Sequence, residues 1–305
     1  MVVVLDGPLG SELTRRGVAT GGIAWSADAN LGAPDVVACI HRDHVAIGCD
    51  LVRANTFRAR PERLTEWQAS LEAAVFLAKD SAGTLPVYGS VAPFGDCYDP
   101  STPELAAARR SHEAVIDRLV RAGVDGLAFE TFPNAEEARM VHKIAQQAGL
   151  PFWISLTAGP SGDVTSPTEL AETARQIAPG ARWVGVNCIA ASLIAPFVDA
   201  IAETSVPVAA YPAGREPCRV WLRGRHPAGT SHRSGRPLFS PRSPHSRSSR
   251  WGRAAERPSS TLGRFAPLSG RFQCGSWALP DRFVRHLCRG IRLFCRDFLR
   301  RFRRE

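Results

Sequence analysis

The chain has 305 residues, with 38 Lys+Arg against 29 Asp+Glu and a hydrophobic content of 44%. This hydrophobic content excludes a protein that is disordered throughout, and the length suits one α/β barrel. No apolar run approaches the roughly 18 residues of a membrane span, the first residues lack the regions of a secretory signal, and no CxxC pair occurs, so we expect a reduced, cytoplasmic protein.

Short apolar runs rich in β-branched residues alternate with helical patterns through residues 1–212. Such runs are typical of strands that are buried on both faces of a parallel sheet. The predicted strands span residues 2–5, 51–54, 86–89, 126–129, 152–156, 183–186 and 207–210. The predicted helices span residues 34–47, 63–82, 103–122, 135–148, 168–177 and 191–204. This repetition favours a (β/α)₈ barrel of the TIM type, with an open doubly wound sheet as the alternative.

The charge distribution changes abruptly near residue 212. Residues 1–212 carry 16 Lys+Arg and 24 Asp+Glu, whereas residues 213–305 carry 22 Arg, no Lys and 5 acidic residues. We therefore divide the chain into a barrel-like part, 1–212, and a basic low-complexity tail, 213–305.

Three interpretations of this tail are open. It is a disordered basic arm that binds nucleic acid, a linker to a helix on a membrane surface, or the out-of-frame translation of a GC-rich gene. The absence of lysine favours the third interpretation, because phosphate binding gives no reason to exclude lysine.

Polar side chains follow the predicted strands at their carboxyl ends, where barrel enzymes place their active sites. The predicted ring comprises Asp6, Asn55, Thr56, Ser90, Glu130, Thr131, Thr157, Asn187, Cys188 and Tyr211. His41 and His44, three positions apart on a predicted helix, have a spacing that can bind a metal. We interpret them instead as part of a polar helix face.

Five segments around these strand ends share a family pattern. Residues 6–13 read DGPLGSEL, residues 48–57 GCDLVRANTF, residues 89–95 GSVAPFG, residues 123–133 GVDGLAFETFP and residues 185–188 GVNC. In this order they resemble the motifs DGG-x-GTEL, GAD-x-x-x-TNTF, GS-x-GP-[YF]-G, GVD-x-x-x-FET-x-P and GVNC of the homocysteine S-methyltransferases. The resemblance covers residues 1–212.

The resemblance implies a (β/α)₈ barrel that moves a methyl group onto the thiol of homocysteine and so makes methionine. It also implies a zinc ion held by three cysteine thiolates, of which Cys188 in GVNC corresponds to one. The other two are adjacent in a GGCC motif that ends strand eight, and this chain has no Cys-Cys pair. We therefore expect a barrel truncated or disrupted after its seventh strand, followed by an arginine-rich tail that is not homologous to the family.

The resemblance further implies which side chains hold the substrates. Asp6 and Glu130 would face the ammonium group of the substrate, and Asn55 and Asn187 would add contacts, with Asn187 orienting either the substrate or the metal ligand. The simpler alternatives are that Glu130 caps a helix, that Asp6 fixes the glycine-rich turn and that Asn55 bonds loop backbone. The expected methyl donor is a sulfonium such as S-methylmethionine, with betaine as the alternative.

The sequence leaves three functional hypotheses. The chain is a zinc-dependent methyltransferase, a catalytically dead remnant of one, or a nucleic-acid-binding protein that acts through its tail. An unclosed barrel has unpaired strand edges, so we also expect a chain of low stability.

Overall fold

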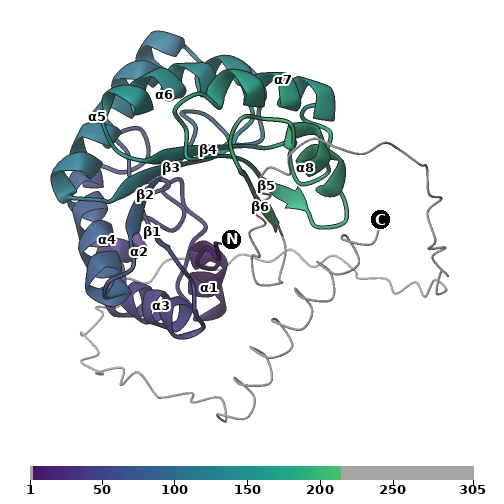
Figure 1. Ribbon diagram of the computed structural model, residues 1–305. Helices are drawn as coiled ribbons and strands as arrows, with labels where there is room; N and C mark the ends of the chain where they lie inside the picture. The colour runs from purple at the N-terminus through teal and green to yellow at the C-terminus, as the bar shows by residue number, and fades with distance from the viewer. Residues whose placement is uncertain (1–2, 214–305) are drawn as a thin grey trace, which may run out of the picture. The chain divides into compact units, whose positions relative to one another are not determined.

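The computed structural model describes residues 3–213, which form a curved sheet of parallel strands backed by helices (Figure 1). The six strands follow one another in chain order across the sheet. They are β1 (Val52–Ala54), β2 (Val87–Val91), β3 (Gly126–Phe132), β4 (Phe152–Leu156), β5 (Trp183–Ala190) and β6 (Val208–Ala213). Ahead of β1, Leu5 forms a single parallel bridge to Leu51. The described residues therefore form a half-barrel.

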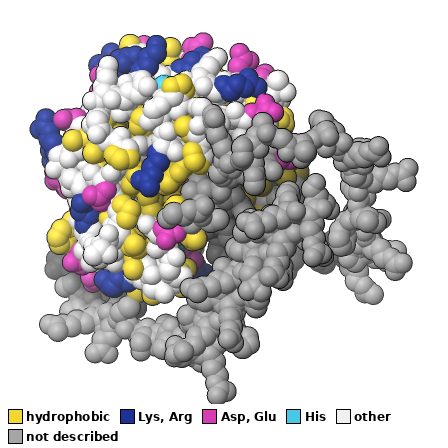
Figure 2. Space-filling model, viewed as in Figure 1, with side chains coloured by type: hydrophobic (Ala, Val, Ile, Leu, Met, Phe, Trp, Pro, Cys, Tyr) yellow, Lys and Arg dark blue, Asp and Glu magenta, His cyan; other side chains and the backbone are white. Residues whose placement is uncertain are grey.

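Helices α3 to α7 follow one another around the outer, convex side of this sheet (Figure 1). The helices are α1 (Leu9–Arg15), α2 (Ala29–Gly32), α3 (Pro34–Ala46), α4 (Trp67–Ala82), α5 (Leu105–Ala122), α6 (Ala135–Gln147), α7 (Pro167–Ile177) and α8 (Ala195–Ile201). Figure 2, which looks at the molecule from the same side as Figure 1, shows charged side chains of both signs around the outer edge of the described part and hydrophobic ones nearer its middle. None of the helices within residues 3–213 is long and apolar enough to cross a membrane.

The predicted elements agree with this architecture. All seven predicted strand positions take part in parallel pairing, although the first contributes one bridge rather than a strand. The six predicted helices are present, whereas α1 and α2 were not predicted, because α1 lies in a glycine-rich segment and α2 has only four residues. The division at residue 212 and every interpretation of the tail concern residues that lie almost entirely outside the described part.

The two faces of the sheet bury different side chains, because successive residues of a strand point to opposite sides. Val52 and Ala54 belong to the large core between the sheet and the helices. A second cluster fills the inner face and includes Tyr88, Trp153 and Trp183. The inner face thus has an aromatic layer below the carboxyl ends of the strands, where the polar residues lie.

Helix starts follow the sequence signals. The Asn134 side chain accepts a hydrogen bond from the Glu137 backbone N–H at 2.9 Å and so caps the start of α6. At the start of α7, the Ser166 hydroxyl accepts from the Glu169 backbone N–H at 3.2 Å, while the Glu169 carboxylate accepts from the Ser166 backbone N–H at 2.9 Å. This reciprocal pair is a capping box.

Replacing Ser166 by alanine is expected to lower the free energy of unfolding by about 1 kcal/mol, because it leaves a helix-end N–H without its acceptor. The measurement is urea unfolding followed by circular dichroism. Ser161→Ala is the matched control, since Ser161 is exposed in the loop before α7 and caps no helix. Equal losses in the two variants would contradict a stabilising role for the cap.

Candidate functional site

The centre of the inner face is a charged cluster built around Arg53. Arg53 lies in the middle of β1, between two residues that point outward, so its side chain enters the barrel interior. Its Nε donates to Asp6 Oδ1 at 2.6 Å and its Nη1 donates to Glu130 Oε1 at 2.5 Å. Asp6 follows the Leu5 bridge and Glu130 lies in β3, so the arginine joins the start of the sheet to its middle.

Both carboxylates of this cluster are almost fully buried, with 2% of Asp6 and 5% of Glu130 exposed. The second oxygen of Asp6 accepts from the Arg53 backbone N–H at 2.8 Å, and the second oxygen of Glu130 accepts from the Ser90 hydroxyl. The sequence predicted Asp6, Ser90 and Glu130 at one end of the barrel, and the structure brings these three together. It did not predict the arginine that links them.

The guanidinium of Arg53 stays positively charged in this cluster. Burial lowers the pKa of Arg53, but the charges of Asp6 and Glu130 more than offset this and hold it well above its ordinary value. The Tyr211 ring lies beside the guanidinium, 5.3 Å from its carbon to the ring centroid. Burial, with the Glu130 charge, raises the pKa of Tyr211 well above its ordinary value. Tyr211 is therefore an uncharged side chain that packs against this cluster.

A second group of polar residues joins the ends of β3 and β5. Asn187 accepts a hydrogen bond from the Thr131 backbone N–H at 2.9 Å and donates to the Thr131 hydroxyl at 2.7 Å. The Asn187 amide nitrogen also lies 3.4 Å from the sulfur of Cys188, and the Thr131 hydroxyl 3.5 Å from it. The Asn187 side chain therefore links Thr131 to Cys188, and its predicted role toward the substrate or the metal ligand stays a prediction.

The backbone at this point is strained. Thr131 has φ 66° and Cys188 has φ 56°, a left-handed conformation that costs non-glycine residues energy, most of all a β-branched one. Both residues sit where the strand register shifts, between Phe129 and Phe132 in β3 and between Asn187 and Ala190 in β5. Such bulges occur next to active sites, where they redirect side chains.

The Cys188 thiol is protonated at neutral pH in the described structure. Burial raises its pKa to about 11, and the nearby charge of Glu130 adds to this. Hydrogen bonds from Thr131 and Tyr98 act in the opposite direction without cancelling the effect. The thiol therefore needs a further positive group before it can act as a nucleophile or ligand.

The described residues do not complete a zinc site. No group of three His, Cys, Asp or Glu within residues 3–213 is arranged to hold a metal ion. Cys188 stands where one thiolate is expected, and Cys97 comes from the loop after β2, with its sulfur 3.7 Å from Arg58 Nη2. Cys39 and Cys49 are the other two cysteines of the described part, and neither belongs to such a group. The last four cysteines, 218, 274, 288 and 295, lie outside the described residues, and no two of them are adjacent.

Asn55 has a well-defined partner set in a loop. Its amide nitrogen donates to the Ser26 carbonyl and to Asn30 Oδ1, each at 2.8 Å, and its side-chain oxygen accepts from the Ser26 hydroxyl at 2.7 Å. These bonds hold the segment that leads into α2. Asn55 therefore forms the loop hydrogen bonds of the simpler alternative, and its predicted contact with the substrate stays a prediction.

The interpretation of His41 and His44 as a polar helix face was wrong. His41 is fully buried and His44 nearly so, because α3 is enclosed between the sheet on one side and α1 and α4 on the other. His44 packs against the turn after Asp6, where a Cβ on Gly7 would lie 2.5 Å from its Nε2. A side chain at position 7 would therefore require the His44 ring to move, which favours glycine there.

Arg60 supports the loop after β2 and was not predicted from the sequence. It is 2% exposed and donates to the backbone carbonyls of Ala92 and Pro93 at 3.0 and 2.8 Å. A third bond runs to the Ser111 hydroxyl in α5 at 2.7 Å. The loop that carries Cys97 and Tyr98 toward Cys188 is therefore anchored at its start.

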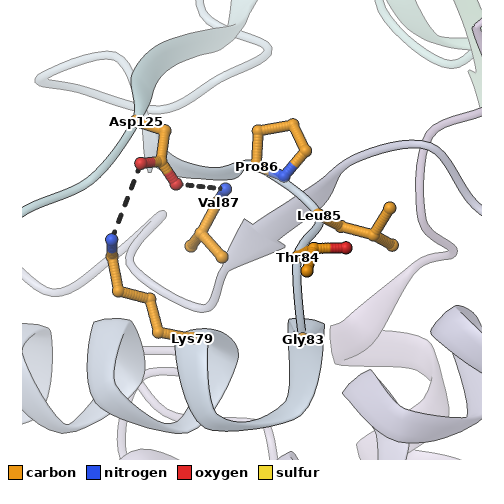
Figure 3. Close-up of a pocket in the computed structure, with 7 residues that line it drawn as sticks. All are labelled: Lys79, Gly83, Thr84, Leu85, Pro86, Val87 and Asp125. Atoms are coloured by element: carbon orange, nitrogen blue, oxygen red, sulfur yellow. Dashed lines mark hydrogen bonds and ion pairs between the residues drawn. The ribbon is translucent and has the colours of Figure 1, made fainter.

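A hollow of about 430 Å³ lies at the opposite, amino end of the strands (Figure 3). Its charged groups are already engaged, since Asp125 accepts from the Val87 backbone N–H at 2.8 Å and pairs with Lys79 at 3.6 Å. Barrel enzymes react at the carboxyl ends of their strands. This hollow is therefore not the candidate site.

Comparison of the sequence with known proteins gives a match to a family model over most of the chain. The family model for homocysteine S-methyltransferase matches residues 3–228. The chain belongs to the homocysteine S-methyltransferase family. The match extends past residue 212, so the family pattern continues somewhat farther than the sequence motifs indicated.

Curated relatives of this family are distant. The chain is 26% identical to homocysteine S-methyltransferase 4 of Zea mays, over 70% of this chain and 73% of the maize protein. It is 27% identical to homocysteine S-methyltransferase of Escherichia coli K12, over 70% and 78%. The S-methylmethionine–homocysteine S-methyltransferase BHMT2 of Rattus norvegicus is 29% identical over 61% of this chain, which spans about half (52%) of the rat protein.

A solved structure supports the fold. The E. coli homocysteine methyltransferase MmuM, in its metallated form, superposes with a TM-score of 0.61 at 24% identity, over 70% of this chain and 84% of MmuM. The half-barrel is thus a partial version of that barrel within the described residues.

Proposed function

We propose that the protein binds homocysteine on the inner face of the half-barrel and methylates its thiol from a sulfonium donor of the S-methylmethionine type, with methionine as the product. Betaine is the alternative donor. The names of the relatives support both, since the rat protein is named for S-methylmethionine and a Xenopus tropicalis relative for betaine.

The observation that carries this proposal is the buried pair Asp6 and Glu130 beside the Cys188 strand end. A carboxylate forms strong charge-assisted hydrogen bonds with an ammonium group in a partly dry pocket. The charge of Glu130 acts on Cys188, which supports an ammonium subsite close to the thiol. An amino acid that carries its own thiol fits this combination.

The alternative is a catalytically dead remnant that keeps the amino-acid subsite. A zinc-activated thiol would lose its proton easily, but the described residues supply one thiol where the family resemblance implies three. The two alternatives share substrate binding and differ in turnover.

The test uses the full chain and separates binding from turnover. Calorimetry should detect L-homocysteine binding, and Glu130→Gln should weaken it at least tenfold, while the exposed control Glu113→Gln leaves it unchanged. Mass spectrometry then measures methionine formed with S-methylmethionine or betaine, with and without added zinc. Methionine formation that depends on homocysteine supports the methyltransferase. Binding without product identifies a dead remnant, and absence of binding refutes the proposal.

A further inference from the structure

We propose that Arg58 and Arg63 form an anion subsite at the carboxyl ends of β1 and β2, and that this subsite binds the carboxylate of the methyl donor. The inference rests on the proposed function and deepens it, because it defines the donor class as a methylated cation that also carries a carboxylate. Both arginines lie beyond the motif of residues 48–57, and the resemblance assigns no role to either.

Two guanidinium groups meet at one backbone carbonyl. Arg58 Nη1 donates to the Gly95 oxygen at 3.2 Å, and Arg63 Nη2 donates to the same oxygen at 3.1 Å. The two arginines lie between β1 and α4, and Gly95 lies in the loop after β2. Two positive charges held at one neutral oxygen repel each other, so an anion bound beside them is stabilised by both.

The acidic side chains near these two groups have other partners. Glu62 accepts from Arg60 Nε at 3.1 Å and from the Ser111 hydroxyl at 2.8 Å. Asp96 accepts from the Tyr98 backbone N–H at 2.8 Å. Within the part of the chain that the structure describes, neither guanidinium of the subsite forms an ion pair. The subsite therefore has positive charge available for a ligand.

Arg63 has a hydrogen-bond donor that is not used. Its Nε is buried and has no hydrogen-bond partner within residues 3–213. Burial lowers the pKa of Arg63 and the charge of Arg58 lowers it further, while the charges of Asp96 and Glu62 act in the opposite direction. An arginine side chain keeps its proton at neutral pH, so both groups remain cations that repel each other. A bound carboxylate would offset this repulsion.

The subsite is close to the cysteine end of the site. Arg58 Nη2 lies 3.7 Å from the sulfur of Cys97. The hydroxyl of the next residue, Tyr98, hydrogen-bonds to Cys188. The Arg58 guanidinium also lies over the Phe57 ring, 5.5 Å from its carbon to the ring centroid, which restricts its orientation. A donor whose carboxylate is held here can therefore extend its methylated cation toward the Cys188 strand end.

The experiment uses calorimetry on the full chain to compare ligands with and without the carboxylate. S-methylmethionine is paired with its decarboxylated form, which keeps the sulfonium and the amino group, and betaine is paired with tetramethylammonium. The proteins are wild type, Arg58→Gln, Arg63→Gln, Arg58→Lys and the control Arg109→Gln. Arg109 is exposed on α5, where it pairs with Glu113 at 3.4 Å.

Wild type and Arg109→Gln should bind the carboxylate member of a pair about tenfold or more tightly than its partner, because the partner cannot form charge-assisted hydrogen bonds with the guanidinium groups. Arg58→Gln and Arg63→Gln should each remove most of this preference by weakening only the carboxylate ligand. Arg58→Lys should keep part of the preference, since lysine retains the charge but not the planar fork.

Three results would overturn the proposal. Equal binding of the two members of each pair by wild type would exclude a carboxylate subsite. Equal weakening of both members in Arg58→Gln would show that Arg58 only holds the loop at Gly95. A loss in Arg58→Gln that affects L-homocysteine and spares both donors would assign the carboxylate subsite to the methyl acceptor.

A measurement on wild type alone covers the case in which a variant does not fold. Sodium acetate, compared with sodium chloride at equal ionic strength, should weaken binding of the carboxylate ligand and leave binding of its partner unchanged, because acetate occupies the anion subsite. The same effect of acetate on both ligands, or on neither of them, overturns the proposal.

A stability measurement separates this inference from the proposed function. Acetate, again compared with chloride, should raise the thermal midpoint of wild type and of Arg109→Gln but not that of Arg58→Gln. If neither homocysteine nor a donor binds while this difference is present, the proposed function fails and the anion subsite stands. If homocysteine binds and no acetate effect depends on Arg58, the inference fails and the proposed function stands.

Discussion

Replacing Trp153 by alanine is expected to lower the free energy of unfolding by about 3–5 kcal/mol. Trp153 is fully buried on the inner face, between Tyr88 at 5.1 Å and Trp183 at 5.4 Å between ring centroids. Its Nε1 also donates to the Tyr211 hydroxyl at 3.4 Å. Alanine would leave a cavity in the aromatic layer of the inner face, which contacts the charged cluster around Arg53 through Tyr211.

Urea unfolding followed by far-ultraviolet circular dichroism measures this loss without relying on tryptophan fluorescence. Phe76→Ala is the control, because Phe76 is 69% exposed on α4 and its removal should change stability by no more than about 0.5 kcal/mol. A loss below about 1 kcal/mol for Trp153→Ala would mean that the inner layer is loosely packed.

The barrel strands could be predicted because their signal is local. Runs such as residues 152–156 and 183–186 combine β-branched or aromatic residues with short length, and the structure contains β4 and β5 there. The chain order of parallel strands then follows from the helix between each pair. This order brings Asp6, Glu130 and Cys188 to one end of the sheet, although they are far apart in the sequence.

Arg53 could not be assigned from its motif, because it stands at a variable position there. A physical signal was nevertheless available. A charged residue between Val52 and Ala54 in an apolar strand must point to the face opposite theirs, and in a barrel that face is the interior. A buried arginine needs carboxylate partners, and Asp6 and Glu130 are the predicted acidic residues of that end.

His41 and His44 were misread because their spacing was examined without their neighbours. Together with Val37 and Ile40 they form a stripe with helical spacing, and all four side chains are buried. The helix α3 packs on α1 and α4 as well as on β1, so more than one of its faces is inaccessible to water. The contact with α1 was not foreseeable, because α1 itself was not predicted.

Acid is expected to destabilise the protein through His41. Neither ring nitrogen of His41 has a hydrogen-bond partner within the described residues. Burial lowers its pKa from 6.5 to about 4, with the nearby charges of His44 and Arg53 adding to this and that of Asp6 opposing it. Between these two values the unfolded chain binds the proton and the folded chain does not, so stability falls as the pH falls through this window.

The expected loss attributable to His41 is roughly 3 kcal/mol between pH 7 and pH 4, since each unit of pKa shift corresponds to about 1.4 kcal/mol. His41→Leu removes the titrating group and keeps an apolar side chain of similar size among Val37 and Ile40. Its stability at pH 7 should equal or exceed that of wild type, because a buried polar group without a partner is costly.

The measurement is the free energy of unfolding in urea at pH 7, 6, 5 and 4.5 for both proteins. The difference between them should widen in favour of His41→Leu at each step below pH 6.5. His44 and His112 also have pKa values lowered by burial, so a remaining acid sensitivity in the variant is expected. Parallel pH profiles for the two proteins would contradict the assignment, because they would require the His41 ring to be protonated to the same extent in the folded and unfolded states.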